Sequence, residues 1–292
     1  MDLAQALCDT GVANSEASFS LFAQNLDPAW VEQALRATGS ATVRKRKLPA
    51  EHVVWLVIGM AMLRDRSIEE VVRHLDLVMP TPLGERQHIS NGAVVQARNR
   101  LGPEPLAWLY HATASVWASA SADEQRWRGL AVLGVDGSTL RVQDSPENDA
   151  HFGRPGSRRD DAIAAYPQLR LVTLMVLRSH LLLDLAFGPY RTSELSLAQA
   201  LWSRVPERSL VIVDRGFANY QLFQTLADPA HQRYWLTRAR QGQHAAILHP
   251  VKDLGPGDAL VELRPERGTR KLNPELPQLI TVRAIQKALA GS

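Results

Sequence analysis

Two apolar segments of the chain each run into an aspartate. Residues 129–138 read GLAVLGVDGS, with Asp136 after the apolar run, and residues 209–220 read SLVIVDRGFANY, with Asp214 in the same place. Mg²⁺ prefers a few carboxylate oxygens and keeps several waters, so aspartates at the ends of two neighbouring strands can share such an ion. A third carboxylate would let the site hold two ions, which clamp the attacking and leaving oxygens in phosphoryl transfer.

Each aspartate also has a simpler interpretation as a turn residue. Asp136 precedes Gly137, and Asp-Gly is a strong turn signal because both residues tolerate turn geometry. Asp214 stands before Arg215 and Gly216, where the same explanation applies. Ligand sites of open α/β sheets gather at the carboxyl ends of the strands, so the two aspartates together favour a metal site.

Other reaction chemistries lack their motifs in this chain. There is no G-x-S-x-G elbow, P-loop, G-x-G-x-x-G fingerprint or His-x-x-x-His spacing. The single cysteine, Cys8, excludes a disulfide framework and a cysteine zinc site, and it indicates a reducing compartment. Glu194 could be an auxiliary carboxylate, or an acid that favours the first turn of a helix through the macrodipole.

Helices dominate the first third of the chain. Asp27 before Pro28 is typical of a helix start, Ser67 and Glu70 have the spacing of a capping box, and Ser90 could cap a helix that ends before Gly102. With two further helical runs at 48–65 and 104–119, these patterns make five helices with short connections and predict a helical bundle near residues 19–120.

The pattern changes near residue 129 to apolar runs that alternate with helical segments. The order is strand, hairpin, helix, strand, helix, strand, which predicts a mixed α/β sheet. Short runs at 259–264 and 279–285 are typical of further strands. We expect an α+β protein with a helical domain over 1–120, a mixed α/β core over 128–249 and a β-rich segment over 250–292, and the family resemblance given below implies DNA binding by the first and catalysis by the second.

Composition is that of a soluble globular protein, with 45% hydrophobic and 22% charged residues among 292. The formal net charge of +3 and the pI near 9.2 permit a nucleic-acid partner without demanding one. The N-terminus has no signal-peptide pattern, and the apolar run at 53–63 is too short to span a membrane. A cytoplasmic protein is expected.

Several basic and amide side chains are candidates for DNA contact. Arginine and lysine could bind phosphates, while glutamine and asparagine can read adenine edges and arginine can read guanine. A solvated loop and an ordinary amphipathic helix remain the alternatives. The candidates are Arg44, Lys45, Arg46, Lys47, Gln96, Arg98, Asn99, Arg100, Arg158, Arg159, Arg238 and Arg240.

The two aspartate segments resemble those of bacterial DDE transposases of the IS4 insertion-sequence family. VDGSTLRVQDSPENDAHFG resembles the family's first-aspartate motif, VIVDRGFANYQLFQTL resembles the second, and ISNGAVVQARNRLGPEPL resembles its N-terminal domain. The resemblance implies a ribonuclease-H-like core in which Asp136 and Asp214 are catalytic and bind Mg²⁺ or Mn²⁺. It also implies cleavage at element ends, transfer of a 3′-hydroxyl into target DNA, and a homodimer on double-stranded DNA at the nucleoid.

One departure from the family pattern concerns its third acid, a glutamate in a helical Tyr-Arg-Glu-Lys signature. The chain lacks that signature, and Glu262, Glu266 and Glu275 lie in Pro/Gly-rich surroundings. We therefore expect an incomplete core, a C-terminal truncation within a β-rich insertion, and impaired catalysis by this chain alone. The alternatives are a non-catalytic DNA-binding protein or inhibitor of an intact transposase, and an unrelated metal-dependent nuclease or phosphatase.

Overall fold

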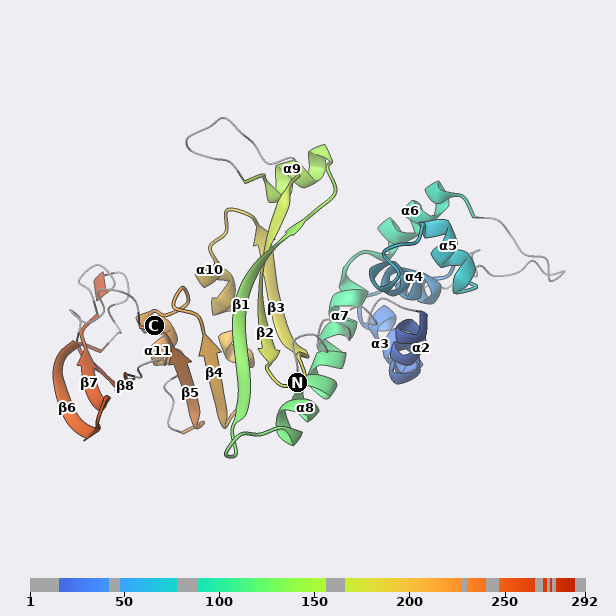
Figure 1. Cartoon of the computed structure of the whole chain (residues 1–292). Coiled ribbons are helices and arrows are strands. Elements are labelled where there is room, and N and C mark those ends of the chain that lie inside the picture. The colour runs from blue at the N-terminus through green and yellow to red at the C-terminus, as the bar shows by residue number, and fades with distance from the viewer. Residues whose placement is uncertain are drawn as a thin grey trace. The chain divides into compact units, whose positions relative to one another are not determined.

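The chain divides into two compact units, Met1–Val116 and Trp117–Ser292 (Figure 1). The computed structural model describes residues 16–41, 48–77, 89–155, 166–226, 230–239, 247–265, 270–271, 274 and 277–286. None of the helices in these ranges has the length and apolar character needed to cross a membrane.

The first unit is helical, as predicted. Its helices are α2 (Glu16–Asn25), α3 (Pro28–Ala37), α4 (Ala50–Met62), α5 (Ile68–His74), α6 (Asn91–Leu101) and α7 (Glu104–Thr113). The predicted caps are confirmed, because the side chains of Asp27, Ser67 and Ser90 each accept a hydrogen bond from a first-turn amide of α3, α5 and α6. Val54 and Leu56 of α4 are fully buried, so this helix lies in the interior of the bundle.

The second unit begins within the π-helix η1 (Ala114–Ala118), and mixed helix and strand follow. Its elements are α8 (Ser119–Glu124), β1 (Ala131–Arg141), α9 (Pro146–Phe152), β2 (Gln168–Val176), β3 (Leu182–Pro189), α10 (Glu194–Gln199), the 3₁₀ helix η2 (Trp202–Arg204), β4 (Ser209–Val213), α11 (Tyr220–Leu226), β5 (Arg233–Thr237), β6 (Ile247–Gly255), β7 (Asp258–Leu263) and β8 (Ile280–Ile285).

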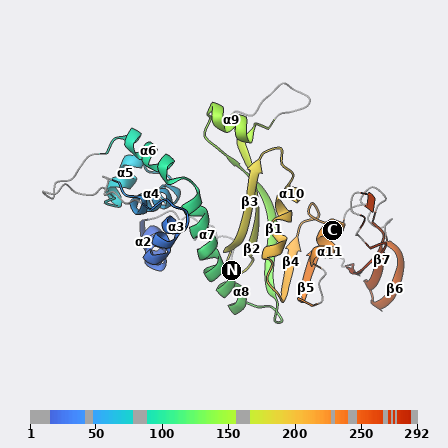
Figure 2. The same ribbon diagram turned by 180° about the vertical axis from the view of Figure 1, so that it is seen from behind.

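The main sheet has five strands in the order β3-β2-β1-β4-β5 (Figure 2). β1 is antiparallel to β2 and β2 to β3, whereas β1 and β4, and β4 and β5, run parallel. Parallel neighbours need crossover connections, which the segments containing α10 and α11 supply. The predicted mixed α+β class is confirmed, and the order fits the ribonuclease-H-like core.

The two faces of the sheet differ in exposure. On the helix face, defined by Leu133, Val135, Val211 and Trp235, the first three side chains are buried, and Trp235 stacks on Phe223 of α11 with the ring centroids 3.9 Å apart. Because side chains alternate along a strand, the residues between them lie on the other side, here called the open face.

The open face is defined by Asp136, Ile212, Tyr234 and Leu236. Tyr234 is 50% exposed and Leu236 48% exposed, whereas the buried core of this unit lies on the helix face. Solvent therefore reaches the side of the sheet that carries Asp136.

A second, three-stranded sheet has the antiparallel order β6-β7-β8. Val261 and Leu263 of β7 belong to the same core cluster as the main sheet, and the Tyr220 hydroxyl donates to the Arg264 carbonyl over 3.0 Å. The strands predicted at 259–264 and 279–285 are confirmed. β6 was not predicted, since Pro250 and Gly255 within it are ordinary strand breakers.

Candidate functional site

Asp136 lies inside β1 and not at its end. Every residue from Asp136 to Arg141 pairs with β2, beginning with Asp136 opposite Thr173. The prediction that the strand stops at Asp136 is therefore wrong. The antiparallel ladder with β2 satisfies the backbone here, so the Asp-Gly pair remains extended in place of forming a turn.

The strand that does end at this level is β4. Its parallel pairing with β1 stops at Val135 opposite Val213, and Asp214 comes directly after the last residue of β4, as predicted. Asp136 and Asp214 thus each come directly after the last pair of β1 and β4. The backbones of such neighbouring strands lie about 4.8 Å apart. The register brings the two sequence-predicted carboxylates to one level of the sheet.

Backbone amides orient both carboxylates. The Gly137 amide donates to Asp136 Oδ1 over 2.8 Å, and the Gly216 amide donates to Asp214 Oδ1. Both aspartates are exposed, and neither forms an ion pair with another described residue. Oxygen donors in such surroundings suit a hard divalent cation such as Mg²⁺ or Mn²⁺.

Arg238 comes directly after β5, at the position that corresponds to Asp214 after β4. Thr237 pairs with Val213, and its hydroxyl donates to the Asp214 carbonyl over 3.3 Å, so Arg238 is the next residue of the third parallel strand. The structure therefore places three predicted residues, Asp136, Asp214 and Arg238, at successive positions across β1, β4 and β5.

No third acid joins this pair among the described residues, where no group of three or more His, Cys, Asp or Glu could hold a metal ion. Glu262 lies in β7, and Glu266 and Glu275 lie outside the described ranges. Two carboxylates therefore carry the candidate metal site in the described part of the chain.

Helix α6 presents the amide and basic candidates of the first unit. It buries Val94, Ala97 and Leu101, and it contacts α4. Its exposed residues include all four candidates of this helix, Gln96, Arg98, Asn99 and Arg100. The other basic candidates, Arg44, Lys45, Arg46, Lys47, Arg158, Arg159 and Arg240, lie outside the described residues.

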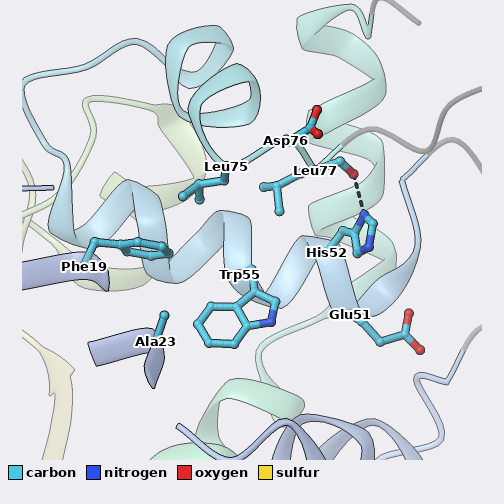
Figure 3. Close-up of a pocket in the computed structure, with 8 residues that line it drawn as sticks. All are labelled: Phe19, Ala23, Glu51, His52, Trp55, Leu75, Asp76 and Leu77. Atoms are coloured by element: carbon cyan, nitrogen blue, oxygen red, sulfur yellow. Dashed lines mark hydrogen bonds between the residues drawn. The ribbon is translucent and has the colours of Figure 1, made fainter. Parts of the chain in front are cut away.

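The first unit also contains an apolar pocket of about 390 Å³ (Figure 3). Trp55 lies in edge-to-face contact with Phe19, and the ring of His52 is hydrogen-bonded to the Leu77 carbonyl. The remaining lining residues are Ala23, Glu51, Leu75 and Asp76. The His52 ring therefore has a backbone partner at the edge of this pocket.

Sequence reasoning missed Arg170, which pairs with Glu194 over 2.8 Å next to β1. Arg170 is the single charged residue of β2, whose sequence is QLRLVTLMV. A lone arginine within an apolar strand of a sheet is a signal that it has an acidic partner, because a partly buried charge requires one. The sequence did not show which acid that partner would be.

Comparison with known proteins agrees with these observations. Residues 16–111 match the family described as insertion element 4 transposase N-terminal, and residues 127–286 match the transposase DDE domain. The chain is 36% identical over 266 residues to the Escherichia coli transposase InsG for insertion sequence element IS4, and the match covers 91% of this chain and 58% of InsG. The chain thus spans less than two thirds of that relative.

A second relative, the Escherichia coli putative transposase InsZ, is 31% identical over 274 residues, covering 91% of this chain and 89% of InsZ. Among solved structures, the piggyBac transposase in a synaptic complex with hairpin DNA aligns with a TM-score of 0.36 at 10% identity, covering 91% of this chain and 53% of that one. Similarity at that level transfers neither fold nor function.

Proposed function

The chain belongs to the IS4 family of DDE transposases, and we propose that it binds insertion-element DNA and supports metal-dependent cleavage and transfer of DNA strands. The observation that carries this proposal is the register of β1 and β4. It brings Asp136 and Asp214 to neighbouring positions on two parallel strands.

Asp136 and Asp214 would hold Mg²⁺ or Mn²⁺ through their carboxylate oxygens. The ion supplies Lewis-acid polarisation of a phosphodiester and activation of the attacking oxygen. The amides of Gly137 and Gly216 keep one oxygen of each carboxylate in a fixed orientation. Arg238, the next residue along the row, would bind a backbone phosphate of the DNA.

The first unit would recognise the ends of the element through α6. The buried face of α6 packs within the helical bundle, and its exposed amide and basic side chains can contact base edges and phosphates. Because a transposition event joins two element ends, we also propose a homodimer on DNA.

With two carboxylates and no third among the described residues, we propose that this chain alone cleaves DNA slowly. A two-metal reaction loses much of its rate when a ligand is lacking, since the ions then no longer clamp both reacting oxygens. Binding of DNA and of one metal ion does not need the third acid.

The experiment that tests the function uses the full chain with Mn²⁺ and a DNA fragment carrying the ends of its element. Electron paramagnetic resonance measures Mn²⁺ binding, which we expect to be lost in Asp136→Asn and in Asp214→Asn. The matched control is Glu207→Gln, which changes an exposed acid of the same unit and should keep Mn²⁺ binding. Equal Mn²⁺ binding by all four proteins contradicts the metal site. DNA binding with no Mn²⁺-dependent nicking would instead support the non-catalytic alternative.

A further inference from the structure

Glu194 occupies the space that a side chain at position 137 would need. A Cβ atom built on Gly137 would lie 2.5 Å from Glu194 Cδ and 2.8 Å from each of its carboxylate oxygens. Non-bonded carbon atoms at optimal separation are about 3.5–4.0 Å apart, so no side chain fits there while Glu194 stays in place. A side chain at position 137 would therefore have to displace the Glu194 carboxylate, a group distant in sequence.

Arg170 fixes the Glu194 carboxylate in this position. Its Nη1 donates to Glu194 Oε1 over 2.8 Å, its Nε donates to the Tyr190 carbonyl over 3.1 Å, and its guanidinium carbon lies 5.0 Å from the centroid of the Tyr190 ring. The Arg170 side chain is 22% exposed and that of Glu194 is 38% exposed. Two contacts with Tyr190 thus hold the guanidinium that binds the Glu194 carboxylate.

Glu194 contacts β1 at Gly137, whose side-chain direction is opposite to that of Asp136 because side chains alternate along a strand. Gly137 is on the helix face with Val135, because side chains alternate along β1. α10 packs against β2 and β3, and its Ala198 belongs to the buried core on that face. Alternation along β1 directs Asp136 to the open face. Glu194 is thus paired with an arginine and separated from the open face by the backbone of β1, which argues against its being a metal ligand.

Glu194 contacts β1 just beyond the point where β1 stops pairing with β4. β4 pairs with β1 only as far as Val135, so from Asp136 onward β1 is held by β2 alone among the described strands. At this point the Gly137 amide donates to Asp136 Oδ1. A shift of the Gly137 backbone would therefore move the donor that orients the carboxylate.

We propose that Arg170 and Glu194 are positioning residues, which hold the Gly137 peptide and through it orient the Asp136 carboxylate for metal binding. This inference rests on the proposed metal site at Asp136 and Asp214. Residues that orient a metal ligand from behind typically contribute about 10–100-fold to metal affinity. The effect of the pair should fall in that range.

The test measures Mn²⁺ affinity and amide hydrogen exchange at Gly137 in the full chain. Glu194→Ala should weaken Mn²⁺ binding about tenfold and speed exchange of the Gly137 amide. Glu194→Gln keeps the shape and the acceptor for Arg170, so its affinity should stay near that of the unchanged chain. Glu207→Gln is the matched control for removal of an acid.

A double variant provides the sharpest comparison. Gly137→Ala should weaken Mn²⁺ binding strongly on its own, since its methyl group meets Glu194, but should add little on the Glu194→Ala background. Thermal unfolding followed in parallel separates a loss of positioning from a loss of folding, because positioning changes affinity at temperatures where every variant is folded.

Each failure identifies its own cause. Unchanged Gly137 exchange in Glu194→Ala overturns the positioning role whether or not metal binds. Equal losses in Glu194→Gln and Glu194→Ala also overturn it, because they would show that the charge of Glu194 is needed. Mn²⁺ binding that survives Asp136→Asn overturns the proposed metal site instead.

Discussion

At the scale of single residues, the register of β1 and β4 brings Asp136 and Asp214 to one level of the main sheet, and a backbone amide donates to Oδ1 of each. Asp214 is where its apolar run predicted, directly after β4, whereas Asp136 lies within a strand that continues to Arg141. Local turn propensity was overridden by pairing with β2, a partner at least 27 residues away that no local pattern shows. The contact between Gly137 and Glu194 is likewise long-range and became visible only once the strands were in register.

The exposed side of α6 gives a prediction about single side chains. Arg98→Ala should weaken binding to element-end DNA about tenfold, since an arginine that reads a guanine edge contributes roughly 1–3 kcal/mol. Fluorescence anisotropy at fixed salt measures the affinity of each variant for element-end and scrambled duplexes. Arg36→Ala removes an exposed arginine from α3, where it pairs with Glu32, and should leave binding unchanged. Equal losses on both duplexes would assign Arg98 to phosphate contact.

At the scale of elements, helix starts were the most predictable features. Ser67 and Glu70 close the capping box of α5: the Glu70 carboxylate accepts from the Ser67 amide over 2.8 Å and from its hydroxyl over 2.7 Å. Such starts depend on residues three apart, so the sequence shows them directly. Strands such as β6 and the second half of β1 depend on partners elsewhere in the chain, and they were missed.

The capping box makes the stability of α5 dependent on pH. Hydrogen bonds from the Ser67 hydroxyl and amide lower the pKa of Glu70. The contribution of the Glu70 carboxylate to the stability of α5 is therefore fully present above its unfolded pKa of about 4.3. That contribution is lost as the pH falls through the folded pKa of Glu70.

Urea unfolding at a series of pH values checks this expectation. Glu70→Gln should destabilise the first unit at neutral pH, and its difference from the unchanged chain should shrink as the solution becomes acidic. A difference that stays constant down to low pH contradicts the argument.

At the scale of the whole molecule, the chain has two compact units, each with its own buried residues. Leu56 is fully buried in the first unit and Leu133 in the second. The boundary between the units follows Val116, a short way before the residues where the sequence changes from helical periodicity to strand-type apolar runs. The sequence shows this change because both patterns are local.

Two cores should give two unfolding transitions. Leu56→Ala and Leu133→Ala each leave a cavity, with an expected cost of about 2–5 kcal/mol, and each should lower the transition of its own unit only. Scanning calorimetry of the full chain, with the two variants as controls for each other, measures this. A single transition that both variants lower equally would show that the units unfold together.

The distance in sequence between Asp136 and Asp214 has a consequence for the chain while it is being synthesised. A ribosome completes β1, β2, β3 and α10 before it reaches β4, so the nascent chain carries Asp136 for a long interval without its partner. The pair forms only when β4 inserts beside β1 as the fourth strand of the sheet to be made. A partly made polypeptide would thus lack the proposed metal site, and pairing of β4 with β1 is the folding step that would bring its two carboxylates together.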